Sequence, residues 1–129
     1  MRSILVLNTK GGSGKTTIAT TLASFYASIG QSVALVDLDA QESSISWLKA
    51  RSSAKPPIIG VKGYGEKIRR GIDYKIIDAP AGLQGSALTK VLNMAESVII
   101  PVLPSPIDMR AAGEFIKDMK KHSRVVKKK

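Results

Sequence analysis

Residues 8–17, with the sequence NTKGGSGKTT, place the strongest constraint on how this chain folds. They follow an apolar run that predicts a strand at residues 3–8 and precede a helical pattern at residues 15–29. Glycines let the backbone turn so tightly that successive N–H groups face one anion, and the N-terminus of the next helix directs its positive dipole end at the same place. A strand, a glycine loop and a helix in this order predict a phosphate-binding loop in an α/β domain.

The residues of the loop have distinct roles in this prediction. Lys15 supplies a cation for the β- and γ-phosphates of a nucleotide, and the hydroxyl of Thr16 suits Mg²⁺, a hard ion that prefers oxygen ligands. The strict spacing GxxxxGK[ST] needs a glycine where this chain has Thr9, so the match is to the variant KGGxGK[ST]. The predicted nucleotide-binding residues are Gly11, Gly12, Ser13, Gly14, Lys15, Thr16 and Thr17.

The rest of the chain alternates between strand-like and helix-like segments. We expect strands at residues 32–37, 58–61, 74–78 and 97–103, and helices at residues 42–51, 64–70, 84–94 and 107–121, with Gly30 ending the first helix. This alternation predicts a three-layer α/β fold with a mostly parallel sheet. Ligands in such folds bind at the carboxyl ends of the strands, so polar motifs that follow different strands should form one site.

Carboxylates follow two of the expected strands. Asp37 and Asp39 lie in the segment VDLDAQ, and Asp78 ends the segment YKIID. Beside a phosphate loop, such carboxylates can hold a metal-bound water or orient a nucleophilic one. The simpler interpretations are an acidic strand end that caps a helix and a buried strand followed by a turn.

The segment KGGSGKTT resembles the deviant Walker A motif of the ParA/MinD family of P-loop ATPases. VDLDAQ is similar to the first switch segment of that family, usually ending DxDPQ, with Ala40 in place of the proline. YKIIDAPAG is similar to the Walker B strand and the second switch, and VIIPVLPSPIDMRAAGEF is similar to the small ParA-like ATPases that position plasmids or protein cargo. The resemblance extends to about Met119 and implies the P-loop NTPase fold.

The resemblance implies ATP and Mg²⁺ as ligands and gives individual residues their roles. Lys10, which could otherwise be an ordinary surface lysine, would cross a dimer interface and contact the phosphates bound by the other subunit. Asp39 would orient the attacking water, and Asp37 and Asp78 would support the magnesium shell with Thr16. The expected catalytic residues are therefore Lys10, Lys15 and Asp39, and the expected metal residues are Thr16, Asp37 and Asp78.

The function implied by the resemblance is an ATP-dependent dimerising switch ATPase in plasmid or chromosome partition or in cargo positioning. Its implied partners are a second copy of the chain, non-specific DNA of the nucleoid and a stimulating adaptor of the ParB type. A MinD-like membrane-associated ATPase is an alternative, but the C-terminal residues are mostly lysine without an aromatic anchor, so we do not expect a membrane partner. A truncated, weakly active nucleotide-binding remnant is a further alternative, and no feature marks the acceptor pocket of a metabolic synthetase.

Charge and cysteine content narrow the remaining possibilities. The net charge is +10, and seven of the twenty Lys and Arg residues lie at or after Lys117. This basic excess suits a polyanion partner, or it serves solubility alone. The chain has no cysteine, which excludes thiolate metal sites and the iron–sulfur reductase relatives.

The organisation that we expect is one P-loop domain at residues 1–121, followed by a basic tail at residues 122–129. The domain would lack the C-terminal strands of the family, which leaves one side of the sheet unprotected. The sequence contains neither an apolar stretch long enough for a membrane span nor a signal-peptide pattern, so we expect a cytoplasmic, nucleoid-associated protein.

Overall fold

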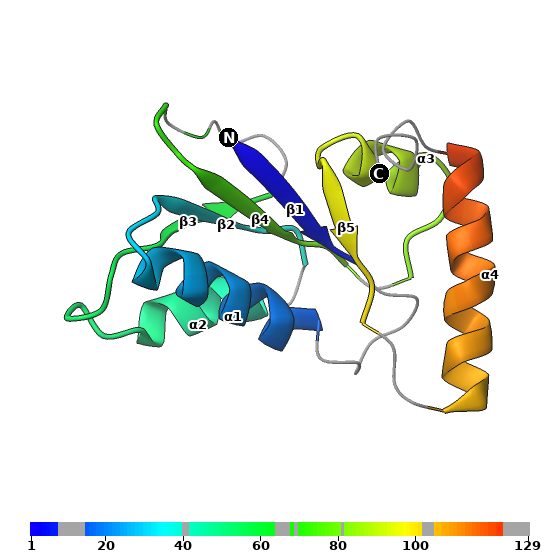
Figure 1. The fold of residues 1–129 in the computed structure, drawn as a ribbon, viewed down its shortest axis with the longest axis horizontal. Helices are drawn as coiled ribbons and strands as arrows, with labels where there is room; N and C mark the ends of the chain where they lie inside the picture. The colour runs from blue at the N-terminus through cyan, green and yellow to red at the C-terminus, as the bar shows by residue number, and fades with distance from the viewer. Residues whose placement is uncertain are drawn as a thin grey trace.

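The protein is a five-stranded parallel sheet covered by helices on both faces (Figure 1). The computed structural model describes residues 1–7, 15–39, 42–63, 68, 70–80, 82–101 and 105–122. The strands are β1 (Arg2–Val6), β2 (Val33–Asp37), β3 (Ile59–Lys62), β4 (Tyr74–Asp78) and β5 (Ser97–Ile99). The helices are α1 (Lys15–Ser28), α2 (Ser43–Ala50), α3 (Gly85–Leu92) and α4 (Pro106–His122). The strand order in the sheet is β3-β2-β4-β1-β5.

Most of the elements lie where the sequence predicts them. The strand expected at residues 97–103 is shorter, because β5 ends at Ile99 and Pro101 follows two residues later; proline has no N–H to donate to a sheet. Residues 102–103 lie outside the described part of the chain. The helix expected at residues 64–70 also falls largely outside it, and the two positions that are described, Ile68 and Arg70, are not helical.

Apolar side chains are buried on both faces of the central strands, as the uninterrupted apolar run of β2 predicts. On one face, α1 packs against β2 and β4 through three small buried residues, Ala19, Ala23 and Ala27. On the other face, buried residues of α3 and α4 pack against β1, β2 and β4. The sheet therefore forms the middle of three layers.

Helix α1 ends where its sequence indicates. Gly30 has a φ of +87°, which side chains with a Cβ rarely adopt. The N–H of Gly30 donates to the carbonyl of Ala27, and the N–H of Gln31 donates to the carbonyl of Tyr26, both at 3.1 Å. These two bonds form a Schellman motif, which satisfies carbonyls that the helix end would otherwise leave unpaired.

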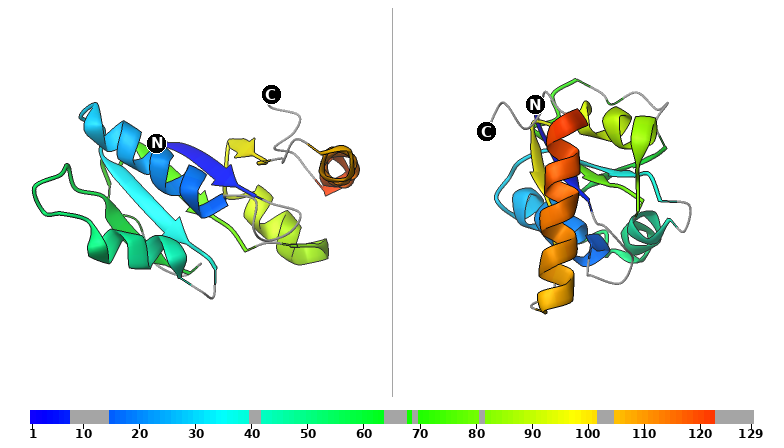
Figure 2. Two further views of the ribbon diagram at one scale, coloured as in Figure 1. Left: turned by 90° about the horizontal axis from the view of Figure 1, so that it is seen from below. Right: turned by 90° about the vertical axis from the view of Figure 1, so that its right-hand side faces the viewer.

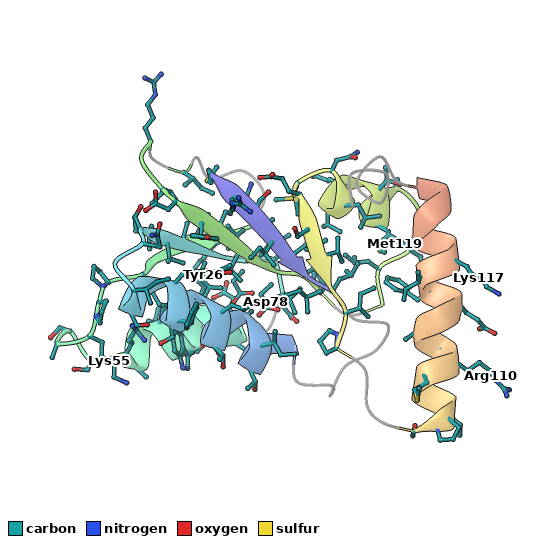
Figure 3. The ribbon with its side chains drawn as sticks, in the orientation of Figure 1. Tyr26, Lys55, Asp78, Arg110, Lys117 and Met119 are labelled. Carbon is teal, nitrogen blue, oxygen red and sulfur yellow. The ribbon has the colours of Figure 1, made fainter. Side chains whose placement is uncertain are left out.

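Helix α4 occupies the β5 side of the molecule, away from α1 and α2 (Figures 1 and 2). Met119 points from α4 toward the body of the protein and is 3% exposed, whereas Arg110 and Lys117 point outward (Figure 3). Ile107 and Met109 remain exposed near the start of the helix. None of the helices in the described part of the chain is both long enough and apolar enough to cross a membrane.

Side-chain contacts connect the amino end of β4 to the start of β2 and to helix α1. One carboxylate oxygen of Asp73, just before β4, accepts a hydrogen bond from the backbone N–H of Ser32 at 2.8 Å and lies 2.9 Å from its hydroxyl. The ring of Tyr26 stacks on the ring of Tyr74 with their centroids 3.8 Å apart. This end of the sheet is held by side chains as well as by the strand ladder.

The contacts of Asp73 predict how stability depends on pH. Hydrogen bonds from the backbone N–H and the hydroxyl of Ser32 lower the pKa of Asp73 below 3.8. A lowered pKa in the folded state means that the contribution of Asp73 is present above about pH 4 and is lost as the pH falls through the folded-state value. We expect Asp73→Asn to lower the thermal midpoint at pH 6, with a deficit that shrinks toward pH 3.

The matched control for this prediction is Glu114→Gln, which removes one charge from an exposed position on α4. Its thermal midpoint at pH 6 should stay close to that of the wild type. An equal deficit in both variants would show that net charge, and not the contact with Ser32, is responsible.

Candidate functional site

The three central strands end side by side at one edge of the sheet. β4 lies between β1 and β2, and its last residue, Asp78, is in register with Val6 on one side and with Asp37 on the other. The segment 8–14 leads toward helix α1, whose first residue is Lys15. The sequence-predicted acidic residues thus lie at the edge where the chain leaves β1 for the glycine loop, and Figure 3 shows Asp78 on this side of the molecule.

Asp37 is almost completely buried, with 3% of its surface exposed. Its Oδ1 accepts a hydrogen bond from the N–H of Asp39, and its Oδ2 accepts one from the N–H of Ile45, both at 3.0 Å. Burial raises the pKa of Asp37 above 3.8, and the nearby carboxylates of Asp78 and Asp39 add to this effect, while the two N–H donors oppose it. A buried carboxylate with acidic neighbours is a favourable place for a cation.

Asp78 is fully buried, and its Oδ2 accepts a hydrogen bond of 2.5 Å from the hydroxyl of Ser44. Ser44 is itself fully buried in the first turn of α2. Sequence reasoning did not identify Ser44 as a residue of this site. The local pattern of α2 contains no signal for it, because the contact joins residues 34 positions apart.

Glu42, which directly precedes α2, is hydrogen-bonded back to the end of the β2 region. The N–H of Glu42 donates to the carbonyl of Asp39 at 3.0 Å, and Glu42 adopts a left-handed conformation with φ of 53°. The carboxylate of Glu42 lies 3.5 Å from the ammonium group of Lys62, at the end of β3. Both side chains are about half exposed, so this ion pair contributes little stability.

Several of the predicted site residues lie outside the part that the structure describes. These are Lys10, Gly11, Gly12, Ser13 and Gly14, together with the side chains of Lys15 and Thr16. Thr17 is described as an exposed residue of α1 whose carbonyl accepts a hydrogen bond from the hydroxyl of Thr20. The structure therefore brings together Asp37, Asp39 and Asp78, and the roles of the loop residues stay predictions.

The donor groups at this edge fit a hard divalent cation. Asp37 and Asp78 are adjacent carboxylates, and oxygen is the ligand atom that Mg²⁺ prefers. Within the described ranges, no group of three or more His, Cys, Asp and Glu side chains is arranged to hold a metal ion. The two carboxylates would thus need additional oxygen ligands, which Mg²⁺ commonly takes from water and from substrate phosphates.

A hollow of about 440 Å³ lies elsewhere, at the amino ends of β2 and β3. It is lined by the end of α1 and by Pro56 and Pro57. This position is at the opposite end of the strands from Asp37 and Asp78, and ligands of parallel α/β sheets bind at the carboxyl ends. The hollow is therefore not part of the candidate site.

Comparison with known proteins identifies the family. Residues 4–128 match the model of the CobQ/CobB/MinD/ParA nucleotide binding domain. The chain belongs to this family. The match includes nearly the whole chain and confirms the ParA/MinD resemblance that the sequence motifs indicate.

One relative within this family is the Maintenance of carboxysome distribution protein A of Gloeobacter kilaueensis. It is 33% identical over 126 residues, an alignment that covers 89% of this chain and 55% of the relative. The chain spans about half the length of that relative.

Solved structures confirm that the fold is the one this family adopts. The putative plasmid partition protein of Borrelia burgdorferi B31, bound to AMPPNP, matches with a TM-score of 0.75 and 19% identity, covering 93% of this chain and 69% of that protein. The pNOB8 ParA protein, bound to nonspecific DNA, matches with a TM-score of 0.72 and 19% identity, covering 91% of this chain and 58% of that protein. At 19% sequence identity, these two matches are evidence for the fold alone.

Proposed function

We propose that the protein is an ATP-dependent switch ATPase of the ParA type. The observation that carries this proposal is the meeting of three strand ends, where β1 leads into the glycine loop beside Asp37 and Asp78. The first residue of α1 and the two buried carboxylates lie at this edge, where a phosphate-binding loop between β1 and α1 would bring a nucleotide. Membership of a nucleotide-binding family supports the same conclusion.

In this proposal the loop residues bind the nucleotide. The backbone N–H groups of residues 11–17 surround the phosphates, and Lys15 neutralises the charge on the β- and γ-phosphates. Thr16, Asp37 and Asp78 would hold a magnesium ion, which would supply positive charge to offset the charge that develops on the transferred phosphoryl group. Asp39 orients the attacking water, a role that suits its partly buried position beside the buried pair.

In this proposal, ATP-dependent dimerisation depends on Lys10, and DNA binding depends on the basic side chains of the surface. Lys10 reaches the phosphates held by a second copy of the chain, so that ATP joins two subunits. The dimer binds DNA through lysine and arginine side chains without base recognition, and this affinity should therefore fall steeply with added salt. An adaptor of the ParB type stimulates hydrolysis and resets the switch on the nucleoid.

The names of two similar proteins support a proposal for the class of cargo. The relative from Gloeobacter kilaueensis is named for the distribution of carboxysomes, and a Borrelia burgdorferi protein of the same fold is described as a putative plasmid partition protein. We propose that this protein positions a plasmid or a large protein assembly in the same manner.

Titration calorimetry of the 129-residue chain with ATP tests the proposal directly. We expect a saturable binding isotherm with one site per chain, and an affinity at least about tenfold higher with Mg²⁺ than with EDTA, because the ion would offset the repulsion between the carboxylates and the phosphates. A matched titration with GTP shows whether the site prefers adenine to guanine. The absence of any binding with Mg²⁺ and ATP would overturn the proposed function.

A further inference from the structure

Ser44 stands apart from the other serines of α2. Ser43 and Ser46 are exposed, whereas Ser44 is fully buried with its hydroxyl 2.5 Å from Oδ2 of Asp78. A hydrogen bond to a buried carboxylate is stronger than one between neutral groups and restricts the orientation of that carboxylate. The contact joins the first turn of α2 to the last residue of β4.

Ile45, the residue after Ser44, contacts the last residue of β2 through its backbone N–H. The N–H of Ile45 belongs to the first turn of α2, where N–H groups have no partner within the helix. Glu42 precedes the helix without capping it through its side chain, and Oδ2 of Asp37 accepts the Ile45 N–H instead, at 3.0 Å. A carboxylate near a helix N-terminus is also favoured by the helix dipole. The first turn of α2 is therefore held by carboxylates from two strands: Asp37 caps a backbone N–H, and Asp78 accepts the hydroxyl of Ser44.

These contacts hold two like charges together. Asp37 and Asp78 are directly opposite each other in adjacent strands, and each would repel the other when both are ionised. Donors from α2 offset part of this repulsion before any cation is present. A cation that arrived at the pair would find both carboxylates already oriented, which lowers the cost of binding.

We propose that Ser44 is a positioning residue that orients Asp78 for the metal ion and thereby couples the first turn of α2 to nucleotide binding. The inference rests on the proposed function, because it takes Asp37 and Asp78 as the residues that hold the ion. Coupling of this kind is reciprocal: if the α2 contacts favour the ion, the ion stabilises the first turn of α2 by the same factor. Helix α2 thus transmits the state of the site toward β3, on which it packs.

The experiment compares the wild type, Ser44→Ala and the matched control Ser46→Ala. Calorimetry gives the ATP affinity of each protein in Mg²⁺ and in EDTA, and the quantity of interest is the ratio of the two. We expect Ser44→Ala to reduce this ratio roughly tenfold, the effect of losing one hydrogen bond to a charged group, while Ser46→Ala retains the wild-type ratio. A purely structural role of Ser44 would change both affinities alike and leave the ratio unchanged.

Amide hydrogen exchange supplies a second readout that does not depend on turnover. In the wild type, Mg²⁺ and ATP should slow exchange in the first turn of α2. In Ser44→Ala this region should exchange faster without ligand, and the slowing by Mg²⁺ and ATP should be largely lost. Ser44→Cys, of nearly the same size but with a weak S–H donor, should reproduce the fall in the affinity ratio if the alanine variant does not fold.

The outcomes separate the two proposals. An affinity ratio within twofold of the wild type in Ser44→Ala or Ser44→Cys overturns the role of Ser44 and leaves the proposed function standing. A lack of ATP binding in the wild type overturns the proposed function and the inference together.

Discussion

Lys15→Ala should lower the affinity for ATP with Mg²⁺ about 100-fold. The substitution removes the side-chain cation that we propose contacts the β- and γ-phosphates, and hydrogen bonds from a charged donor to an anion contribute about 1.5–3 kcal/mol each. Alanine is a good helix former, so α1, which begins at this residue, should stay intact. Calorimetry measures the affinity, and circular dichroism confirms that the fold is retained.

Lys117→Ala is the matched control for this prediction. Lys117 is exposed on α4 and points away from the body of the protein (Figure 3). Its replacement removes the same charge from the chain, so any general electrostatic attraction for ATP changes equally in both variants. If Lys15→Ala bound ATP within threefold of the control, the loop would not be the phosphate site.

Lys10→Ala should retain nucleotide binding but lose ATP-dependent dimerisation and most of the turnover. Because Lys10 is proposed to contact phosphates held by the partner subunit, the variant should bind ATP as a monomer with nearly wild-type affinity. Its ATP-dependent dimerisation should be lost, and its turnover should fall roughly 1,000-fold, as when a cation supplied in trans is removed from a phosphoryl-transfer site. Sedimentation with and without ATP measures the dimer, and phosphate release measures turnover.

The control for Lys10→Ala is Lys55→Ala, an exposed lysine in the loop between α2 and β3 (Figure 3). It should dimerise and hydrolyse ATP like the wild type. DNA binding provides an independent check, since it should become insensitive to ATP in Lys10→Ala but not in Lys55→Ala. Intact dimerisation and turnover in Lys10→Ala would refute the role proposed for this residue.

Local sequence was sufficient to place most elements and the acidic residues of the site. β4 begins and ends at the residues that the segment YKIID predicts, because its two isoleucines supply the apolar residues that a strand buried between two neighbours needs on both faces. The same pattern led to Asp78, which directly follows the buried isoleucines. Parallel geometry then placed Asp37 beside it, since strand ends of one direction meet at one edge.

The features that the sequence did not reveal depend on contacts between distant segments. Nothing in the segment SSISW distinguishes Ser44 from its neighbours, since its burial depends on how α2 lies against β4. The left-handed conformation of Glu42 could not be predicted either, because glutamate has no strong preference for it. β5 is shorter than its apolar sequence suggests, because Pro101, two residues after its end at Ile99, has no N–H to donate to a neighbouring strand.

The parallel sheet with β1 inside it also has a consequence for biosynthesis. β1 leaves the ribosome well before its partners in the sheet, β4 and β5, which begin at residues 74 and 97. Pairing between segments so far apart is slow, because a long loop must close before any contact forms. The glycine loop is attached to β1, so we expect a nascent chain to gain no affinity for phosphate until β4 has been synthesised and has paired with β1. Nucleotide present during translation would then act only after β1 and β4 have paired.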